Sequence, residues 1–343
     1  MKKVVAIHLF ELRFGEHFHV LPDLLQLLRR YLQNVTLRGS NRKMRYLLPL
    51  QYIEAIANHG SIRKAASNLS ITPSALNRRL LSMEDELGVL LFERLPTGVR
   101  LTTAGEIMLD HIRNQISDME RVQSRIADLS GMRRGHVSIA CSPEALGQFL
   151  PNQIKIYRDK FPGVTFQLNV CSRGEAETAL ADHSADIAIV FEPMKLANFQ
   201  ILFTLKQSIS CIVQRDHPLA SRKSVRLYEC VDYPLLLPSQ PSGVRHLLEG
   251  SAARLGLNLK SAVSANNLQF LQNYALDGDH ICFDIPINLP SNMEERGKQS
   301  VAIDSRDVSP GFLFIGHLRG RTLPVASARF LEDIVETLAK YDE

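Results

Sequence analysis

The sequence lacks the features that would place it among membrane, secreted or enzymatic proteins. None of its apolar runs approaches the ~18–20 residues that a membrane-spanning helix needs. It contains no P-loop, no G-x-G-x-x-G after a predicted strand, no H-E-x-x-H and no G-x-S-x-G motif. We therefore expect a protein that is not an enzyme and that has no cofactor, no metal site and no membrane-spanning segment. An enzyme or a solute-binding protein with an accessory helical domain is the alternative.

Cysteine pairs are also absent. The five cysteines are scattered singly, are odd in number and include no C-x-x-C pair, which argues against both a disulfide framework and a zinc site. The N-terminus has lysines followed by an apolar patch, but charged residues interrupt this patch early and no small-residue cleavage site follows. These features predict a cytoplasmic protein whose thiols are buried in apolar strands.

The positive charge is concentrated in the front of the chain. The 343 residues have a formal net charge of +4. Residues 1–43 contain 8 Lys and Arg against 3 Asp and Glu, and residues 44–102 contain 7 against 5. Residues 135–343 contain 20 against 23. A basic front half is typical of a protein that neutralises phosphates, although a solvated basic face would have the same composition.

Residues 61–88 predict two short helices joined by a tight polar turn. Ser61 is suited to cap the first helix, whose alanines are small enough to let two helices cross closely. Thr72 is suited to cap the second helix, with Pro73 at the first position, where a missing N–H costs nothing. This second helix carries an apolar stripe and a polar, cationic N-terminal half, as a recognition helix in the DNA major groove does.

Five landmarks follow one another over about sixty residues. They are Ala65-Ala66, Thr72-Pro73-Ser74, Glu86-Leu87-Gly88, Leu91-Phe92-Glu93-Arg94 and Leu101-Thr102-Thr103-Ala104-Gly105. Together they resemble the winged helix-turn-helix domain of LysR-type transcriptional regulators, whereas a lone pair of helices at this spacing also occurs in ordinary helical hairpins. The resemblance implies a DNA-binding domain at residues 44–102, with a wing whose turn lies at residues 96–98.

The resemblance also implies which residues face operator DNA. The candidates are Ser61, Thr72, Pro73, Ser74, Asn77, Arg78, Arg79, Arg94 and Arg100. Arg78 is the expected contact with guanine O6 and N7, worth ~1–3 kcal/mol of discrimination. Asn77 stands where relatives usually have serine, and it is expected either to contact adenine bidentately or to hold a phosphate. Arg79 is expected to contact a phosphate or to face solvent.

Residues 103–134 predict a linker region with one long helix at about 104–131. Apolar residues recur in it at alternating spacings of three and four, which is a heptad seam. The seam residues are Leu109, Ile112, Ile116, Met119 and Ile126. The resemblance implies that this helix pairs with its twin in a homodimer or homotetramer. Burial of the same stripe within one chain is the alternative.

From residue 135 onward, strands and helices alternate, as they do in α/β folds. Motifs in this part resemble the effector-binding domain of the same family, which shares the fold of type 2 periplasmic binding proteins. They are Phe161-Pro162, Ala185-Asp186-Ile187-Ala188-Ile189, Asp216-His217-Pro218-Leu219-Ala220 and Ala326-Ser327-Ala328-Arg329-Phe330.

The implied fold is therefore α plus α/β. An N-terminal winged helix-turn-helix and a long linker helix precede a C-terminal domain, 135–343, of two α/β subdomains. Subdomain I is expected at about 135–208 and 315–343, and subdomain II at about 209–314. Two crossovers would join them, with a ligand cleft between.

Binding proteins of this fold hold small anions at helix N-termini, where free N–H groups and the helix dipole favour negative charge. The residues that correspond to such positions are Ser142, Ser172, Ser239, Asn266 and Asn267. Each is also a candidate N-cap, and their convergence is implied by the resemblance alone. Asp284 places a carboxylate near the expected cleft, which favours an effector with an amine over a purely anionic one.

Residues 1–43 fall outside the resemblance. Residues 22–35 have the pattern of one amphipathic helix, and a polar linker follows it. We favour an upstream in-frame start that the cell does not use over an added helix that packs on the dimer or on DNA.

The sequence thus predicts a cytoplasmic, sequence-specific DNA-binding regulator. The expected partners are a double-stranded DNA operator, a small-molecule effector, a second copy of the chain and, as a further candidate, RNA polymerase. A winged-helix architectural protein without an effector is the remaining alternative.

Overall fold

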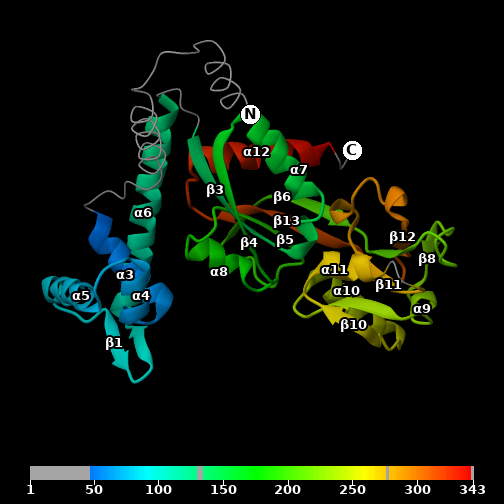
Figure 1. Cartoon of the computed structure of the whole chain (residues 1–343), viewed down its shortest axis with the longest axis horizontal. Coiled ribbons are helices and arrows are strands. Elements are labelled where there is room, and N and C mark those ends of the chain that lie inside the picture. Colours follow the sequence, from blue (N-terminus) through cyan, green and yellow to red (C-terminus); the bar gives the residue numbers. More distant parts are fainter. Residues whose placement is uncertain (1–46, 130–133, 276–277, 341–343) are drawn as a thin grey trace, which may run out of the picture. The chain divides into compact units, whose positions relative to one another are not determined.

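The computed structural model describes residues 47–129, 134–275 and 278–340. They form two compact units that divide between Glu106 and Ile107 (Figure 1). The predicted N-terminal helix and the whole 1–43 segment lie outside the described residues. Within the described ranges, no helix is long and apolar enough to cross a membrane.

The first unit is a helix-turn-helix followed by a two-stranded wing. Its elements are α3 (Leu48–His59), α4 (Ile62–Asn68), α5 (Pro73–Leu87), β1 (Phe92–Leu95) and β2 (Gly98–Leu101). Both predicted caps are confirmed: the Ser61 side chain accepts a hydrogen bond from Lys64 N, and the Thr72 side chain accepts one from Ala75 N. The polar turn between α4 and α5 therefore ends one helix and begins the next with local hydrogen bonds.

Small residues let the parts of this unit approach closely. Ala65 and Ala66 of α4 are fully buried, as is Leu76 of α5. A β-carbon on Gly98 would lie 2.2 Å from the carbonyl oxygen of Gly60, so the wing packs against the end of α3 only because glycine stands there.

The linker helix α6 (Thr103–Leu129) begins in the first unit and continues into the second. Its N-terminus is capped by Thr102, whose hydroxyl accepts a hydrogen bond from Gly105 N at 3.0 Å. The expected helix end near residue 131 lies outside the described residues.

The second unit contains two mixed sheets. The first has the strand order β4-β3-β5-β13-β6 and the second β10-β9-β11-β7-β12-β8. The first sheet comprises β3 (Arg134–Cys141), β4 (Gly163–Val170), β5 (Ile187–Phe191), β6 (Phe199–Gln207) and β13 (Gly311–Leu318). The second comprises β7 (Ser210–Gln214), β8 (Ser224–Val225), β9 (Leu235–Pro238), β10 (Ser261–Ala265), β11 (Ile281–Asp284) and β12 (Lys298–Ile303).

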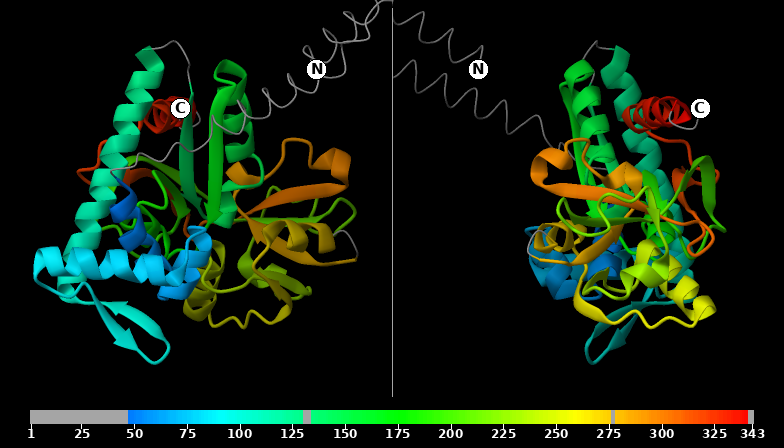
Figure 2. Two further views of the ribbon diagram at one scale, coloured as in Figure 1. Left: turned by 60° about the vertical axis from the view of Figure 1, so that its left-hand side comes forward. Right: turned by 90° about the vertical axis from the view of Figure 1, so that its right-hand side faces the viewer.

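The chain passes between the sheets twice, from β6 to β7 and from β12 to β13, as the two expected crossovers require. In the first sheet β3 is parallel to β4 and β5, whereas β13 is antiparallel to β5 and β6. Figure 1 shows β13, from the far end of the chain, beside β5 and β6, and Figure 2 gives two further views of the sheets.

Helices cover both faces of each sheet. They are η2 (Pro143–Ala145), α7 (Phe149–Lys160), α8 (Ala176–Ala181), α9 (Leu227–Cys230), α10 (Gly243–Leu255), α11 (Leu268–Tyr274), η3 (Pro286–Asn288), η4 (Glu294–Arg296) and α12 (Val325–Ala339). Side chains alternate between the faces of a strand, so Ile139 of β3 packs in one cluster with α7 and α12, and Ala140 packs in another with α8. In the second sheet, Leu237 packs with α10 and Leu236 with α11.

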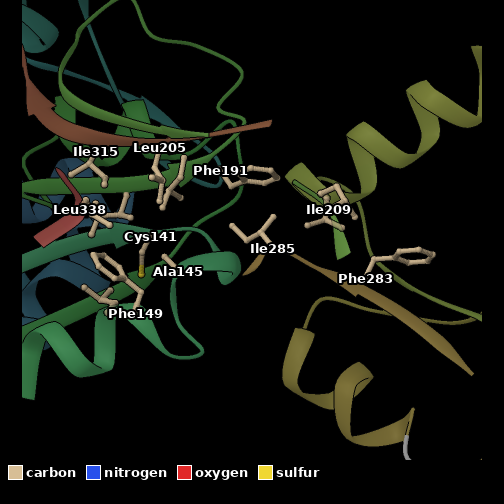
Figure 3. Packing of buried hydrophobic residues seen from close by; sticks show 14 of the residues in the cluster. Cys141, Ala145, Phe149, Phe191, Leu205, Ile209, Phe283, Ile285, Ile315 and Leu338 are labelled. Atoms are coloured by element: carbon tan, nitrogen blue, oxygen red, sulfur yellow. The ribbon is translucent and has the colours of Figure 1, made fainter. Parts of the chain in front are cut away.

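One hydrophobic cluster continues through both sheets. Phe191 of the first sheet lies near Ile209 and Ile285, where the two sheets meet (Figure 3). All five cysteines are buried, and burial raises the pKa of Cys141 and of Cys171 to about 12. The expectation of buried thiols is confirmed.

Residues 143–160 form two helices, η2 and α7, because Gly147 turns the chain between them against Asn288 at a distance that a β-carbon would not allow. Two details differ from the sequence-based picture. Strand β12 was not predicted. Strand β13 begins at Gly311, earlier than the boundary expected at about 315, and it belongs entirely to the first sheet.

Candidate DNA-binding surface and effector cavity

The N-terminal end of α5 presents short polar side chains to solvent. Thr72, Pro73 and Ser74 are exposed, and the Thr72 and Ser74 hydroxyls lie 3.2 Å apart. The Thr72 hydroxyl oxygen also accepts a hydrogen bond from Ala75 N, so it already has a structural role as the cap of α5. Ser61 has the same capping role for α4. Both residues therefore shape the turn, whatever else they contact.

The two arginines that follow on α5 differ in their surroundings. The Arg79 guanidinium lies over the ring of Tyr52, 5.1 Å from its centroid, in a cation–π contact that holds it against α3. Arg78 is exposed and, within the described residues, has no side-chain hydrogen bond, ion pair or ring contact. Arg78 is thus the cation of this helix that is available to a partner.

Two further candidates are paired within the unit. Arg94 of β1 donates from Nη2 to Oδ1 of Asn77 at 2.8 Å, which joins the wing to α5. Arg100 of β2 donates from Nε to Glu93 at 3.0 Å, an exposed ion pair across the wing. Exposed pairs of this kind contribute little to stability, so Arg100 can exchange its carboxylate for a phosphate at low cost.

A buried carboxylate that the sequence reasoning missed fixes the position of the wing. Glu84 is 6% exposed, and its Oε1 accepts hydrogen bonds from Leu91 N at 2.7 Å and from Phe92 N at 3.1 Å. The signal was present in the spacing, since Glu84 follows Leu76 and Leu80 at intervals of four on the buried face of α5.

The second unit contains two subdomains, each built on one of the two sheets. A cavity of about 500 Å³ lies between these subdomains. Pro143, Leu146, Gly147, Gln148 and Val170 line it from the first subdomain. Asn266, Asn267, Leu268, Gln269, Gln272, Asn288, Pro290 and Arg296 line it from the second. Carboxamides thus dominate its polar surface, and Arg296 is the single charged side chain among these lining residues.

The predicted effector residues separate into two groups. Asn266 and Asn267 line the cavity, and Asn267 also caps α11 through Phe270 N. Ser142, Ser172 and Ser239 lie outside the lining. Ser142 accepts a hydrogen bond from Phe191 N, and Ser239 lies 3.2 Å from the Ser264 hydroxyl. Ser172 is half-buried, and its backbone N–H donates to the Glu175 carboxylate.

A hydrogen-bonded chain crosses the cavity wall from one subdomain to the other. Gly147 N donates to Asn288 Oδ1 at 2.5 Å, and Asn288 Nδ2 donates to Asp284 Oδ2 at 2.7 Å. Gln272 Nε2 donates to the same carboxylate at 2.8 Å. Burial raises the pKa of Asp284 to about 8, against the opposing effect of these donors. Asp284 therefore lies behind the lining and supports Asn288 and Gln272.

A second contact joins the subdomains through Glu144. This residue is fully buried, and its Oε1 accepts a hydrogen bond from the Ser242 hydroxyl at 3.1 Å. Ser242 caps α10 on the other side of the cleft. The other carboxylate oxygen of Glu144 has no hydrogen-bond partner within the described residues.

The predicted seam of α6 is unevenly exposed. Leu109 and Ile112 are buried, Ile116 and Met119 are half-buried, and Ile126 is 55% exposed. Ser117, beside the seam, accepts a hydrogen bond from Arg321 Nε at 3.1 Å. The N-terminal part of the stripe is thus covered within the chain, and the C-terminal part is open. In the described part of the chain, no three metal-ligating side chains gather.

These features define a class of protein. A winged helix-turn-helix with an exposed arginine on its second helix precedes an α/β unit whose two subdomains enclose a polar cavity. This is the organisation of a ligand-responsive DNA-binding regulator.

Comparison with known protein families identifies the family to which this regulator belongs. Residues 47–106 match the bacterial regulatory helix-turn-helix model of the lysR family, and residues 130–339 match the LysR substrate binding domain. The chain belongs to the LysR family of transcriptional regulators. It is a DNA-binding transcriptional regulator with an effector-binding domain, and not an enzyme.

Individual relatives agree with this assignment. The HTH-type transcriptional activator CmpR of Synechocystis sp. is 29% identical over 214 residues, which cover 62% of this chain and 70% of CmpR. A full-length CbnR in complex with its target DNA has the same fold, with a TM-score of 0.55, 19% identity, and 85% of this chain and 99% of CbnR covered. A full-length OxyR variant from Pseudomonas aeruginosa gives a TM-score of 0.61 at 17% identity, covering 87% and 95%.

Proposed function

We propose that this regulator binds its operator in the cytoplasm by inserting the first turns of α5 into the major groove, with Arg78 as the principal base contact. The observation that carries the proposal is that Arg78 is exposed on the N-terminal half of α5 and unpaired within the described residues. Arginine contacts guanine O6 and N7 bidentately. Pro73 and Ser74 lie in the first turn of α5, one turn before Arg78, and we assign Arg100 of the wing to the flanking phosphate backbone.

The test compares Arg78→Ala with Arg79→Ala in the full chain. Duplexes selected by the wild type from a randomised pool serve as operator, and unselected duplexes serve as random DNA. We expect Arg78→Ala to weaken operator binding by ~5- to 100-fold while random DNA changes little. Arg79→Ala should have a smaller effect, because that guanidinium is held over Tyr52. Equal losses on both kinds of DNA would assign Arg78 to phosphate contact.

We place the effector in the cavity between the two subdomains. Six carboxamide side chains and Arg296 favour a small polar molecule with an anionic group and several hydrogen-bonding groups. An amine is not favoured, because Asp284 lies behind the lining. Such a ligand changes DNA binding only through different affinities for two arrangements of the protein.

Thermal shifts of the full chain test this assignment. A panel of hydroxycarboxylates, sugar phosphates and amines is compared for the wild type, Arg296→Gln and the exposed control Arg215→Gln. We expect an anionic compound to stabilise the wild type and the control but not Arg296→Gln. Stabilisation by amines alone would contradict the assignment.

We also propose that the C-terminal half of the α6 stripe pairs two copies of the chain. A homodimer is the smallest assembly that presents two recognition helices to a partly palindromic site, and a homotetramer would pair two such dimers. Sedimentation of Val122→Asp should show a shift towards monomer. Asn114→Asp, on the outer face, should leave the assembly unchanged. Contact with RNA polymerase belongs to the same proposal and is tested by joint footprinting on a selected operator.

A further inference from the structure

The Asn77–Arg94 hydrogen bond has a consequence for base recognition. Asn77 lies in the second turn of α5, and Arg94 lies in the first strand of the wing. Their side chains meet at 2.8 Å between Arg94 Nη2 and Asn77 Oδ1, with Arg94 exposed and Asn77 half-buried. This contact joins a residue on the expected base-facing side of the helix to a cation that comes from another element.

An asparagine amide that has no protein partner offers a donor group, Nδ2, and an acceptor, Oδ1. The amide is able to rotate so that either group faces the DNA. That pairing matches adenine, whose major-groove edge offers the N7 acceptor and the N6 amino donor. Guanine offers two acceptors, N7 and O6. An asparagine with a free Oδ1 therefore suits adenine better than guanine.

Arg94 changes this balance in two ways. The guanidinium has only donors, so its partner atom on Asn77 must be the oxygen, which fixes the orientation of the amide. The bond is also charge-assisted, and it places a positive charge beside Oδ1. That charge repels the amino group of adenine and attracts the acceptors of guanine.

We propose that Asn77 and Arg94 act as one composite donor unit that recognises guanine, and disfavours adenine, at a single operator position. Arg94 contributes the N–H donors that do not bond to Asn77, and Asn77 contributes its Nδ2 donor to the same contact with guanine. Arg94 is in this respect a specificity-determining residue of the wing. The inference rests on the proposed docking of α5 in the major groove.

The surroundings distinguish this unit from the neighbouring cations. Arg100, on the second strand of the wing, is paired with Glu93 rather than with α5. Arg79 is held over Tyr52 on α3. The recognition helix thus carries one arginine that acts alone, Arg78, and one amide that acts with a wing arginine.

The test measures base preference at every operator position. The wild type, Asn77→Ala, Arg94→Gln and the double variant each select duplexes from a randomised pool, and affinities follow on duplexes that differ at one base pair. We expect one position where the wild type prefers guanine to adenine by ~5- to 100-fold. Both single variants should lose this preference, and the double variant should lose no more than either.

Three controls separate the possible outcomes. Arg100→Gln should weaken binding to all sequences alike without changing any base preference. Adenine preference at the position that responds to Asn77→Ala, or effects of the two variants at different positions, would overturn the composite unit. Failure of the underlying docking is recognised separately, because Arg78→Ala would then leave operator selectivity unchanged. Thermal melting establishes that each variant is folded.

Discussion

The two units of the chain build their sites in different ways. In the first, the candidate DNA-contacting residues lie between Ser61 and Arg100, on a few consecutive elements whose caps are local. In the second, the cavity is lined by segments near residues 143–170 and 266–296, which are far apart in the chain and are brought together by two crossovers.

The difference extends to the use of polar side chains. On the first unit, an exposed cation remains without a hydrogen-bond or ion-pair partner within the described residues, and Arg78 is the clearest example. In the second unit, the side chains of two of the five polar residues selected from the sequence, Ser142 and Ser239, make polar contacts outside the cavity lining. A surface that contacts DNA can be assembled from one helix and one wing, whereas a cavity between subdomains requires the whole topology.

The largest expected effect concerns the support of the wing. Replacing Glu84 by Ala leaves two buried backbone N–H groups, those of Leu91 and Phe92, without an acceptor. The free energy of unfolding of the first unit should fall by about 3 kcal/mol. Calorimetry of the full chain measures it as a selective shift of one transition. The exposed Glu86→Ala is the matched control, and an equal shift for both would refute the role of Glu84.

The second prediction concerns pH and the second unit. The folded protein keeps Asp284 protonated up to about pH 8, whereas an unfolded chain releases this proton near pH 4. Between these values the folded state binds more protons, so the free energy of unfolding falls as pH rises, by up to about 1.4 kcal/mol per pH unit.

Denaturant titrations of the wild type and Asp284→Asn between pH 5 and 7.5 measure this slope. The slope should be shallower in the variant and unchanged in the exposed control Asp232→Asn. A wild type that gains stability over this range relative to Asp284→Asn would show that the buried carboxyl is ionised.

A third prediction addresses the bond between the subdomains. Asn288→Ala removes the acceptor of Gly147 N and a donor to Asp284. The second unit should lose about 2 kcal/mol of stability, because Gly147 N loses its acceptor and Asp284 Oδ2 keeps only Gln272 as a side-chain donor. Chemical denaturation of the full chain measures the loss. Asn292→Ala, an exposed neighbour, should be near neutral, and a comparable loss there would argue against the bridging role.

The smallest expected effect is at the N-terminus of α5. Thr72→Ala removes the oxygen that accepts from Ala75 N, at a cost of about 1 kcal/mol. The melting temperature of the first unit should fall slightly, and Thr72→Ser should restore it. Loss of operator binding far beyond this change in stability would mean that Thr72 contacts DNA itself.

Features that depend on local contacts could be predicted from the sequence, whereas features that depend on distant contacts could not. The caps at Ser61, Thr72 and Asn267 were recognisable because each side chain bonds to a backbone N–H within three residues. The landmarks of the helix-turn-helix are equally local. Strand β12, by contrast, is a short segment that begins with a buried lysine, and only its pairing with β7 and β8 makes it a strand.

The candidate site residues also differ in whether their local sequence predicts their role. Arg78 could be selected from the sequence because its position on a capped helix determines its exposure. Gln272, Asn288 and Arg296 could not, since nothing in their own neighbourhoods indicates a cavity. Asn77 lies between these cases: its place on the helix was predictable, but its partner, Arg94, is seventeen residues away and on a strand.

The sequence by itself determined the order of the domains, the two helix caps of the turn and the family of the protein, because helix periodicity, capping and short motifs act over a few residues. Only the tertiary structure decided which polar groups remain available. It directs Ser142 to a backbone N–H, places Asp284 behind the cavity wall and commits the oxygen of Asn77 to Arg94. A hydrogen bond needs its partner within about 3 Å, and for Ser142 and Asn77 the fold brings that partner from another element of the chain.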